Sequence, residues 1–273
     1  MEWIEQMDIL TLCTQIGLQS EIRNRVIDFA DIFNFCTVGK LLKEFQIYEQ
    51  MKAARMKLQT VLADDVDNIK MLTCMLKASA DVYDIYKAKG ISDEIYFATM
   101  RCYTRFINET YRTTGKLYFD RYWWTTRQAG CHLFRIGELE YEMKHINNEV
   151  IIGLHIPSDA DFSPSSVDIS LQRAKEFFAE YYPELANSEY HCHSWLLDGQ
   201  LRDMLSVNSN ILNFQNRFEI FDEGEVDTEF IEWLFNTKST DYKSFPEKTS
   251  LQKKMKKHLL FGGVIRNAYG RLK

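Results

Sequence analysis

The residues whose types and spacing could do chemistry are concentrated in one short segment, Tyr190 to Trp195. The segment contains two histidines, His191 and His193, with Cys192 between them. Its residues favour a strand, and alternate strand residues share a face, so both histidines would lie on one face with Trp195. A neutral imidazole accepts a proton near pH 7, and a His pair can also contribute to a metal site. The segment therefore predicts a base or, with a further ligand, a metal centre.

His155 ends a second candidate strand, the apolar run from Glu149 to Ile156. The residues from Val167 to Tyr182 have helical periodicity, so strand, helix and strand form a parallel crossover. Ligands bind beyond the carboxyl ends of such strands, where His155 and His193 would meet. These two histidines are candidate bases, and with His191 they are candidate ligands of a metal-dependent hydrolase. The structural alternative is that they hydrogen-bond the backbone at the strand ends.

The other chemically active side chains also have two interpretations each. Cys192 is adjacent to histidines, as a nucleophile would be, but its opposite direction favours a buried inert thiol. Asn208 and Asn210 would orient a substrate, or they cap a helix or form an Asx turn. The arginines among aromatic residues would hold a carboxylate, or they pair with nearby glutamates. The residues concerned are Arg121, Arg127, Arg135, Glu138, Glu140 and Glu142.

Two further features are ambiguous in the same way. The pair Trp123 and Trp124 would line an acyl pocket, although such a pair is more often part of a core. The basic run Lys253 to Lys257 would contact a phosphate, although it is more often the solvated face of a helix.

The elements that must position these residues fall into two parts. All four prolines lie after residue 150, and residues 1–115 have helical periodicity, which predicts four to six packed helices. Residues 116–273 would form a second domain of mixed strands and helices. Leu117 to Trp124 is strand-compatible, although Tyr122 to Gln128 could also start a helix, and Phe218 to Phe221 with Phe230 to Phe235 suggest a closing hairpin. The fold class predicted is α+β, with an all-helical N-terminal domain followed by a mixed α/β domain.

Composition excludes several classes of protein. The chain has 273 residues, of which 45% are hydrophobic and 26% charged, and its net charge is -6, which argues against a nucleic-acid binder. The six cysteines form no CxxC pair and are expected to be reduced core thiols. The acidic start MEWIEQMD is not a signal peptide, and no run reaches the length of a membrane span. These observations predict a cytoplasmic protein that does not bind a membrane.

Several stretches resemble a bacterial family of acyltransferases with a helical N-acyltransferase N-terminal domain and a GNAT-like C-terminal domain. They are WWTTRQAGCHLFRIGELEYE (123–142), HIPSDADFSPSSVDISLQRAKEFF (155–178), HCHSWLLDGQL (191–201), NSNILNFQNRF (208–218) and KTSLQ (248–252). The resemblance implies two domains, 1–115 and 116–273, and an acyl-CoA or acetyl-CoA co-substrate. It implies that EVIIGLHIP and YHCHSWLLD are the strands that splay apart around the acyl-pantetheine arm.

The resemblance also implies roles for named residues in acyl transfer to a small amine-bearing substrate. His155, His193 and Asn210 would be catalytic or positioning groups, and Trp124, Arg135 and Trp195 would contact the substrate. The co-substrate would lie against five residues at and after the first strand end, Ile156, Pro157, Ser158, Ser165 and Ser166. No metal is expected, and the sequence gives no oligomeric state.

One segment favours an alternative function, a non-catalytic small-molecule-binding protein on the same fold. GNAT enzymes cradle the CoA pyrophosphate in a glycine-rich turn before a helix. This chain has SDADFSPSSVD at that place, without glycine and with Asp159 and Asp161. The amides of a helix start bind anions, whereas two carboxylates oppose an anion electrostatically.

Overall fold

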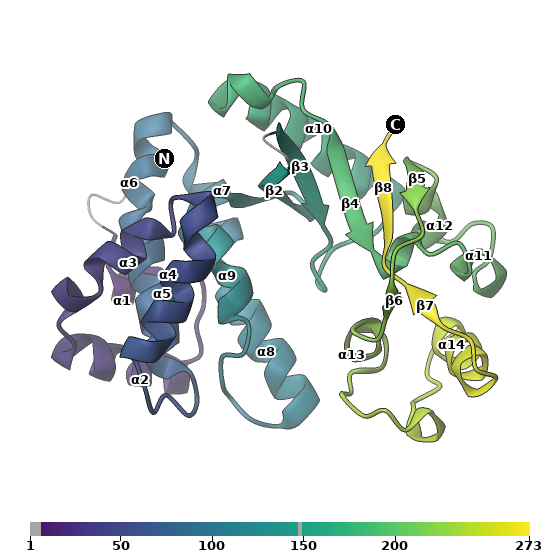
Figure 1. The fold of residues 1–273 in the computed structure, drawn as a ribbon, viewed down its shortest axis with the longest axis horizontal. Coiled ribbons are helices and arrows are strands. Elements are labelled where there is room, and N and C mark those ends of the chain that lie inside the picture. Colours follow the sequence, from purple (N-terminus) through teal and green to yellow (C-terminus); the bar gives the residue numbers. More distant parts are fainter. Residues whose placement is uncertain (1–6, 147–148) are drawn as a thin grey trace. The chain divides into compact units, whose positions relative to one another are not determined.

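A computed structural model describes residues 7–146 and 149–273 (Figure 1). The chain divides into two compact units, Met1–Ile136 and Gly137–Lys273. The first is helical and the second contains a mixed sheet, which confirms the predicted α+β class. The composition change expected after residue 115 coincides with Gly115, whose positive φ ends α8 (Cys102–Thr114). The start of the second domain at residue 116 stays a prediction.

The first unit is built from short helices around one buried helix. In the described part of the unit the helices are α1 (Ile9–Gln15), α2 (Ser20–Ile32), η1 (Phe35–Thr37), α3 (Gly39–Glu44), α4 (Tyr48–Val61), α5 (Ile69–Asp81), α6 (Tyr83–Lys89), α7 (Asp93–Met100), α8 and α9 (Tyr122–Ala129), followed by strand β1 (Leu133–Ile136). They outnumber the four to six predicted because apolar periodicity continues across breaks at Val82 and Arg101. Most residues of α5 are buried, so it forms the centre of this core.

The second unit is an α/β arrangement around a sheet. Its elements are β2 (Leu139–Ile146), β3 (Glu149–His155), α10 (Pro164–Tyr181), η2 (Pro183–Leu185), β4 (Tyr190–Ser194), η3 (Trp195–Leu197), α11 (Leu201–Met204), α12 (Asn210–Gln215), β5 (Phe218–Asp222), β6 (Val226–Asp227), α13 (Phe230–Phe235), η4 (Tyr242–Ser244), α14 (Ser250–Leu260), β7 (Ile265–Arg266) and β8 (Ala268–Leu272). Within this unit the strands are neighbours in the order β2-β3-β4-β8-β5 (Figure 1). β3 and β4 are parallel and α10 connects them, which confirms the predicted crossover.

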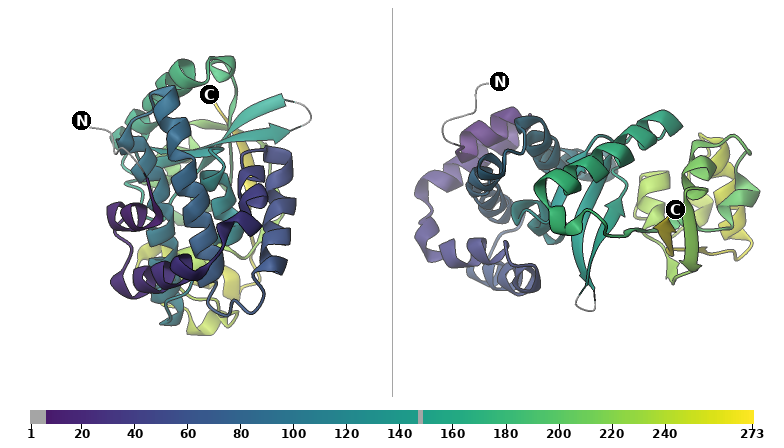
Figure 2. Two further views of the ribbon diagram at one scale, coloured as in Figure 1. Left: turned by 90° about the vertical axis from the view of Figure 1, so that its left-hand side faces the viewer. Right: turned by 90° about the horizontal axis from the view of Figure 1, so that it is seen from above.

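α10 lies against one face of this sheet (Figure 2). The hydroxyl of Ser170 in α10 accepts a hydrogen bond from the Leu139 amide at 3.2 Å and is bonded to the Tyr141 hydroxyl at 3.0 Å. The ring of Phe178 packs on Tyr190 with centroids 6.3 Å apart. Side chains that alternate with these along the strands point to the opposite face, where the histidines and charged residues lie.

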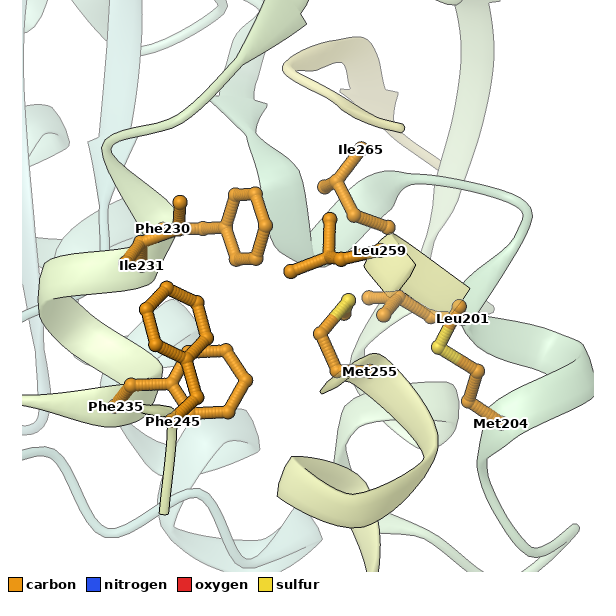
Figure 3. Packing of buried hydrophobic residues seen from close by; sticks show 9 residues of the cluster. All are labelled: Leu201, Met204, Phe230, Ile231, Phe235, Phe245, Met255, Leu259 and Ile265. Atoms are coloured by element: carbon orange, nitrogen blue, oxygen red, sulfur yellow. The ribbon is translucent and has the colours of Figure 1, made fainter. Parts of the chain in front are cut away.

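A separate hydrophobic cluster fills the C-terminal part of the second unit (Figure 3). It joins α11, α13 and α14 with β7 through Leu201, Met204, Phe230, Ile231, Phe235, Phe245, Met255, Leu259 and Ile265. The expected closing hairpin is therefore wrong. Phe230–Phe235 is helix α13, and β5 pairs with β8 instead. An aromatic run of six residues satisfies a buried helix as well as a strand, and periodicity alone does not separate them.

The segment Leu117 to Trp124 is not a strand either. Helix α9 begins at Tyr122, as the alternative interpretation of this segment allowed. In the part of the chain that is described, no helix is both long and apolar enough to cross a membrane.

Candidate functional site

The site begins where the hydrogen-bonded ladder between β3 and β4 ends. The last paired residues are Leu154 and Cys192. One residue further, His155 still pairs with Glu140 of β2, and His193 still pairs with Tyr269 of β8. The two strands therefore stay bound to their outer neighbours while they stop pairing with each other. This is the place where the family resemblance implied that the two strands part, and both candidate histidines stand there.

Glu142 of β2 holds the ring of His155. The distance from His155 Nε2 to Glu142 Oε2 is 2.8 Å, and the Glu142 side chain is 2% exposed against 24% for His155. A carboxylate accepts hydrogen bonds, so Nε2 donates and Nδ1 is the basic nitrogen of the neutral ring. A buried carboxylate behind an imidazole fixes the orientation of the ring and stabilises the imidazolium formed when it takes a proton.

His193 is exposed and stacks on Tyr269. The ring centroids are 3.8 Å apart and the planes differ by 8°. Loss of hydration near these neighbours lowers the pKa of His193 from its ordinary value, and the positive charge of Lys144 lowers it further. Asp227 and a hydrogen bond to the backbone of Asn267 oppose this lowering of the pKa. The net effect of these neighbours favours the neutral form of His193.

The other residues of the central segment separate as strand geometry requires, with one exception. Cys192 is buried on the opposite face, and burial raises its pKa to about 12, so it is an inert thiol as predicted. His191 shares the face of His193 and bonds Glu189 at 2.8 Å. Trp195 does not continue this face, because β4 ends at Ser194. Its ring packs on Phe230 of the hydrophobic cluster, with centroids 5.7 Å apart.

The residues expected to contact a co-substrate lie between β3 and the start of α10. Ile156 is half-buried, Pro157 is buried, and Ser158 and Ser165 are exposed. Ser166 donates a hydrogen bond to Asp161 at 2.7 Å.

Asp161 itself occupies the helix start. Its carboxylate also accepts hydrogen bonds from the amide and hydroxyl of Ser163, at 3.0 and 2.9 Å. The bond from Ser166, followed by those from Ser163, lowers the pKa of Asp161. The amide of Asp161 donates to Glu138 at 2.8 Å. The turn is therefore held by its own carboxylate rather than by glycine.

The remaining predicted residues belong to other elements. Asn210 is the exposed first residue of α12, with Ser209 as its cap. Trp124 and Arg135 belong to the first unit. The Arg127 guanidinium lies 4.4 Å from the Trp124 ring, and the Arg135 amide donates to Thr99 Oγ1 at 2.9 Å. Their roles toward a substrate stay predictions.

Sequence reasoning missed Glu142 and Tyr269 as parts of the site. The sequence favours Glu142 as an arginine partner, and its alternation with Glu140 and Lys144 along one strand face is the signal for a role in the site. Tyr269 lies 76 positions beyond His193, a separation that follows from the residue numbers of the pair in β4 and β8. In residues 7–146 and 149–273, no group of three or more His, Cys, Asp or Glu side chains is arranged to hold a metal ion. The metal-dependent hydrolase therefore has no ligand set among these residues.

Two family models match nearly the whole chain. The N-acyltransferase N-terminal domain matches residues 7–131, and the GNAT-like C-terminal domain matches residues 133–272, which is more than half of the chain. The chain belongs to the family of proteins that combine an N-acyltransferase N-terminal domain with a GNAT-like C-terminal domain. The resemblance predicted from its motifs is thus confirmed, and β3 and β4 of this GNAT-like protein are the two strands at which the ladder ends.

Solved structures show the same fold at low sequence identity. An acyltransferase in complex with decanoyl-CoA and teicoplanin has a TM-score of 0.78 and 21% identity over 96% of this chain and 86% of its own. An acyltransferase in complex with CoA and 10C-teicoplanin has a TM-score of 0.73 and 20% identity over 98% of this chain and 99% of its own. No curated protein sequence matches this GNAT-like chain.

Proposed function

We propose that this protein transfers an acyl group from acyl-CoA to the amine of a small substrate in the cytoplasm. One observation carries the proposal. The carboxylate-backed imidazole of His155 stands where β3 and β4 cease to pair. Parting of these strands gives GNAT enzymes the gap for the acyl-pantetheine arm, and the chain belongs to a GNAT-like family.

In this mechanism His155 is the general base. It takes a proton from the attacking amine through Nδ1 while Glu142 stabilises the resulting imidazolium. The amine nitrogen forms a bond to the thioester carbon, the tetrahedral intermediate collapses, and the carbon–sulfur bond breaks. His155 then returns the proton to the leaving CoA thiolate. Atoms and charge balance without another reactant.

The other predicted residues complete the proposal. His193, whose neutral form is favoured, positions the amine beside His155, and Asn210 orients the acceptor. Ile156, Pro157, Ser158, Ser165 and Ser166 contact the co-substrate, and Trp195 contacts the acceptor. The structural neighbours guide the choice of donors, because they are acyltransferases in complex with decanoyl-CoA and octanoyl-CoA.

A specific observation favours the alternative, a binding protein without turnover. Asp161 already satisfies the hydroxyls of Ser163 and Ser166 at the start of α10. A pyrophosphate at that helix start would meet this carboxylate, whereas a ligand without phosphate would not.

Two measurements on the full chain separate the functions. The first is calorimetric titration with acetyl-, octanoyl- and decanoyl-CoA. The second is detection of free CoA and acylated product by mass spectrometry with a panel of primary amines. Mass spectrometry is preferred to a thiol reagent, because Cys36 is exposed and would react. Acyl-CoA binding with product formation supports the acyltransferase, and amine binding without acyl-CoA binding supports the alternative. Absence of heat and of product with every donor at millimolar concentration excludes the transferase.

A further inference from the structure

Four aromatic rings gather on the sheet face opposite α10, on the strands that follow the pair His155 and Glu142, which we call the dyad. They come from three adjacent strands: His191 and His193 from β4, Tyr269 from β8 and Phe221 from β5. Tyr269 stacks on His193, Phe221 lies 6.2 Å from Tyr269, and His191 lies 5.5 Å from Phe221, all between centroids. We call these four residues the aromatic platform.

A local irregularity of the sheet builds the outer end of the platform. β5 pairs with β8 in regular register from Phe218 to Ile220, and then a bulge places Asp222 opposite Tyr269. Phe221 is the extra residue at this bulge, and its ring lies beside Tyr269 in a tilted contact. Bulges are known to redirect side chains and to end pairing at sheet edges. The phenyl ring is held in this position although 57% of its surface is exposed.

Ion pairs fix the side of the platform that faces away from the dyad. Arg271 bonds Glu189 at 3.0 Å and Glu219 at 2.8 Å, and Glu189 bonds His191. The ring of His191 is thus oriented by a carboxylate network, and the charge of Arg271 is compensated. The opposite side of the platform reaches the site itself, because His193 and His155 each stand one residue beyond the last pair of the β3–β4 ladder, on adjacent strands.

The chemistry of these surfaces selects a class of ligand. Tyr269 and His193 each cover one face of the other ring, and exposed His193 and Phe221 present aromatic surface that gains when it is removed from water. An aromatic ring satisfies both, since rings stack in offset or edge-to-face geometry at centroid distances of about 4.5–7 Å. A saturated chain of equal size would gain the apolar term without the ring geometry.

We propose that the aromatic platform binds an aromatic ring of the acceptor and presents its amine to His155. This inference rests on the proposed function for the identity of the reaction, but binding of the ring can be measured without turnover. Phe221 is accordingly a specificity-determining residue at the outer end of the site, and the amine would extend from the ring toward the end of the β3–β4 ladder.

The test compares two amines that differ in the ring alone. Phenethylamine and its ring-saturated analogue cyclohexylethylamine are titrated into the full-length protein, and binding is followed by chemical-shift changes of the His193 and Tyr269 rings. The variant Phe221→Leu removes the aromatic ring and keeps apolar volume. Phe261→Leu is the matched control, because Phe261 is an exposed phenylalanine at the end of α14, 83% exposed.

Stacking predicts that phenethylamine binds about three- to tenfold more tightly than its saturated analogue. Phe221→Leu should abolish this preference, and Phe261→Leu should preserve it. Equal affinity for the two amines, or equal effects of the two variants, overturns the inference. Turnover of aliphatic amines with no preference for aryl amines overturns the platform and leaves the acyltransferase intact. Ring-selective binding without any acyl-CoA turnover supports the platform and refutes the proposed reaction.

Discussion

At the scale of single residues, activity should depend most directly on the contact between Glu142 and His155. Replacing His155 by Gln removes the base, and replacing Glu142 by Gln removes the charge that stabilises its protonated form. We expect His155→Gln to lower kcat/KM by about 10²-fold or more, and Glu142→Gln to lower it by a smaller factor. The measurement is product formation by mass spectrometry under subsaturating amine.

A histidine outside the site provides the control for these substitutions. His258 in α14 bonds the Val264 carbonyl at 3.0 Å, and His258→Gln should leave kcat/KM within about twofold. A result in which His258→Gln and His155→Gln lower kcat/KM equally would show that the loss reflects folding, and the assignment of His155 as base would then fail.

The lowered pKa of His193 predicts a pH dependence of stability. Partial loss of hydration and the Lys144 charge make the folded protein bind this proton more weakly than the unfolded chain, whose His has an ordinary pKa of 6.5. The full stability is therefore present above pH 6.5 and declines as the pH falls from 6.5 toward the folded pKa. Proton titration of the His193 ring by NMR should give a midpoint below 6.5, and Lys144→Met should raise that midpoint.

His193→Gln isolates the same effect in the free energy of unfolding. The wild-type protein should lose more stability than this variant between pH 7.5 and 5.5 in urea unfolding experiments. If both lose equal amounts, the proton on His193 does not contribute to the pH dependence.

Thiol chemistry separates Cys36 from the other cysteines. Cys36 is exposed, whereas burial raises the pKa of Cys13, Cys74, Cys131 and Cys192 to about 12. Because thiolates are the reactive form, a thiol reagent should modify about one cysteine in the native protein and six after denaturation. Cys36→Ser should abolish the native reaction, and rapid native modification of this variant would contradict the buried positions.

At the scale of elements, α14 shows how a sequence signal and a packed face act together. Thr249 and Gln252 form a capping box at its start, and Met255 and Leu259 pack in the hydrophobic cluster of Figure 3. Thr249→Ala should lower the free energy of unfolding by about 1 kcal/mol, because the Gln252 amide loses its acceptor. Thr249→Ser keeps the hydroxyl, so its urea midpoint should stay near that of the wild-type protein, and equal losses in both variants would refute the cap.

Elements with a clear period or a clear stop could be predicted from sequence, and the others could not. The run from Glu149 to Ile156 became β3, and the pattern from Val167 to Tyr182 became α10. The strand predicted for Phe230–Phe235 was wrong because packing on Met255 and Phe245, which lie later in the chain, decides that this segment is a helix. The pairing of Glu142 with His155 could not be predicted for a related reason. The contact depends on the register of β2 and β3.

At the scale of the whole molecule, each unit has its own buried core. Met75 in α5 and Met255 in α14 are both fully buried, one in each unit. Met→Ala at either position should cost about 2–5 kcal/mol. Hydrogen exchange should show the larger loss of protection in the unit that carries the substitution. Equal losses in both units from each variant would show that the chain unfolds as one cooperative body.

The whole fold was more predictable than its chemistry. Family motifs and the crossover order identified the architecture, because both depend on residues that are close to one another in sequence. The positions of Trp195 and Asp161 depended on where β4 ends and on which hydroxyls a turn brings together. A few hydrogen bonds decide where such a strand ends and how such a turn folds, and a single sequence does not reveal them.

Asp161 has a consequence for how the protein receives charged ligands. The Asp161 carboxylate already accepts hydrogen bonds from Ser163 and Ser166, so a negative charge of the chain itself lies at the start of α10. A phosphate group that binds there must compete with Asp161 for the hydroxyls of Ser163 and Ser166. Its affinity depends on how readily the loop gives up its own bonds, and the change Asp161→Asn would remove the negative charge that opposes a phosphate at this helix start.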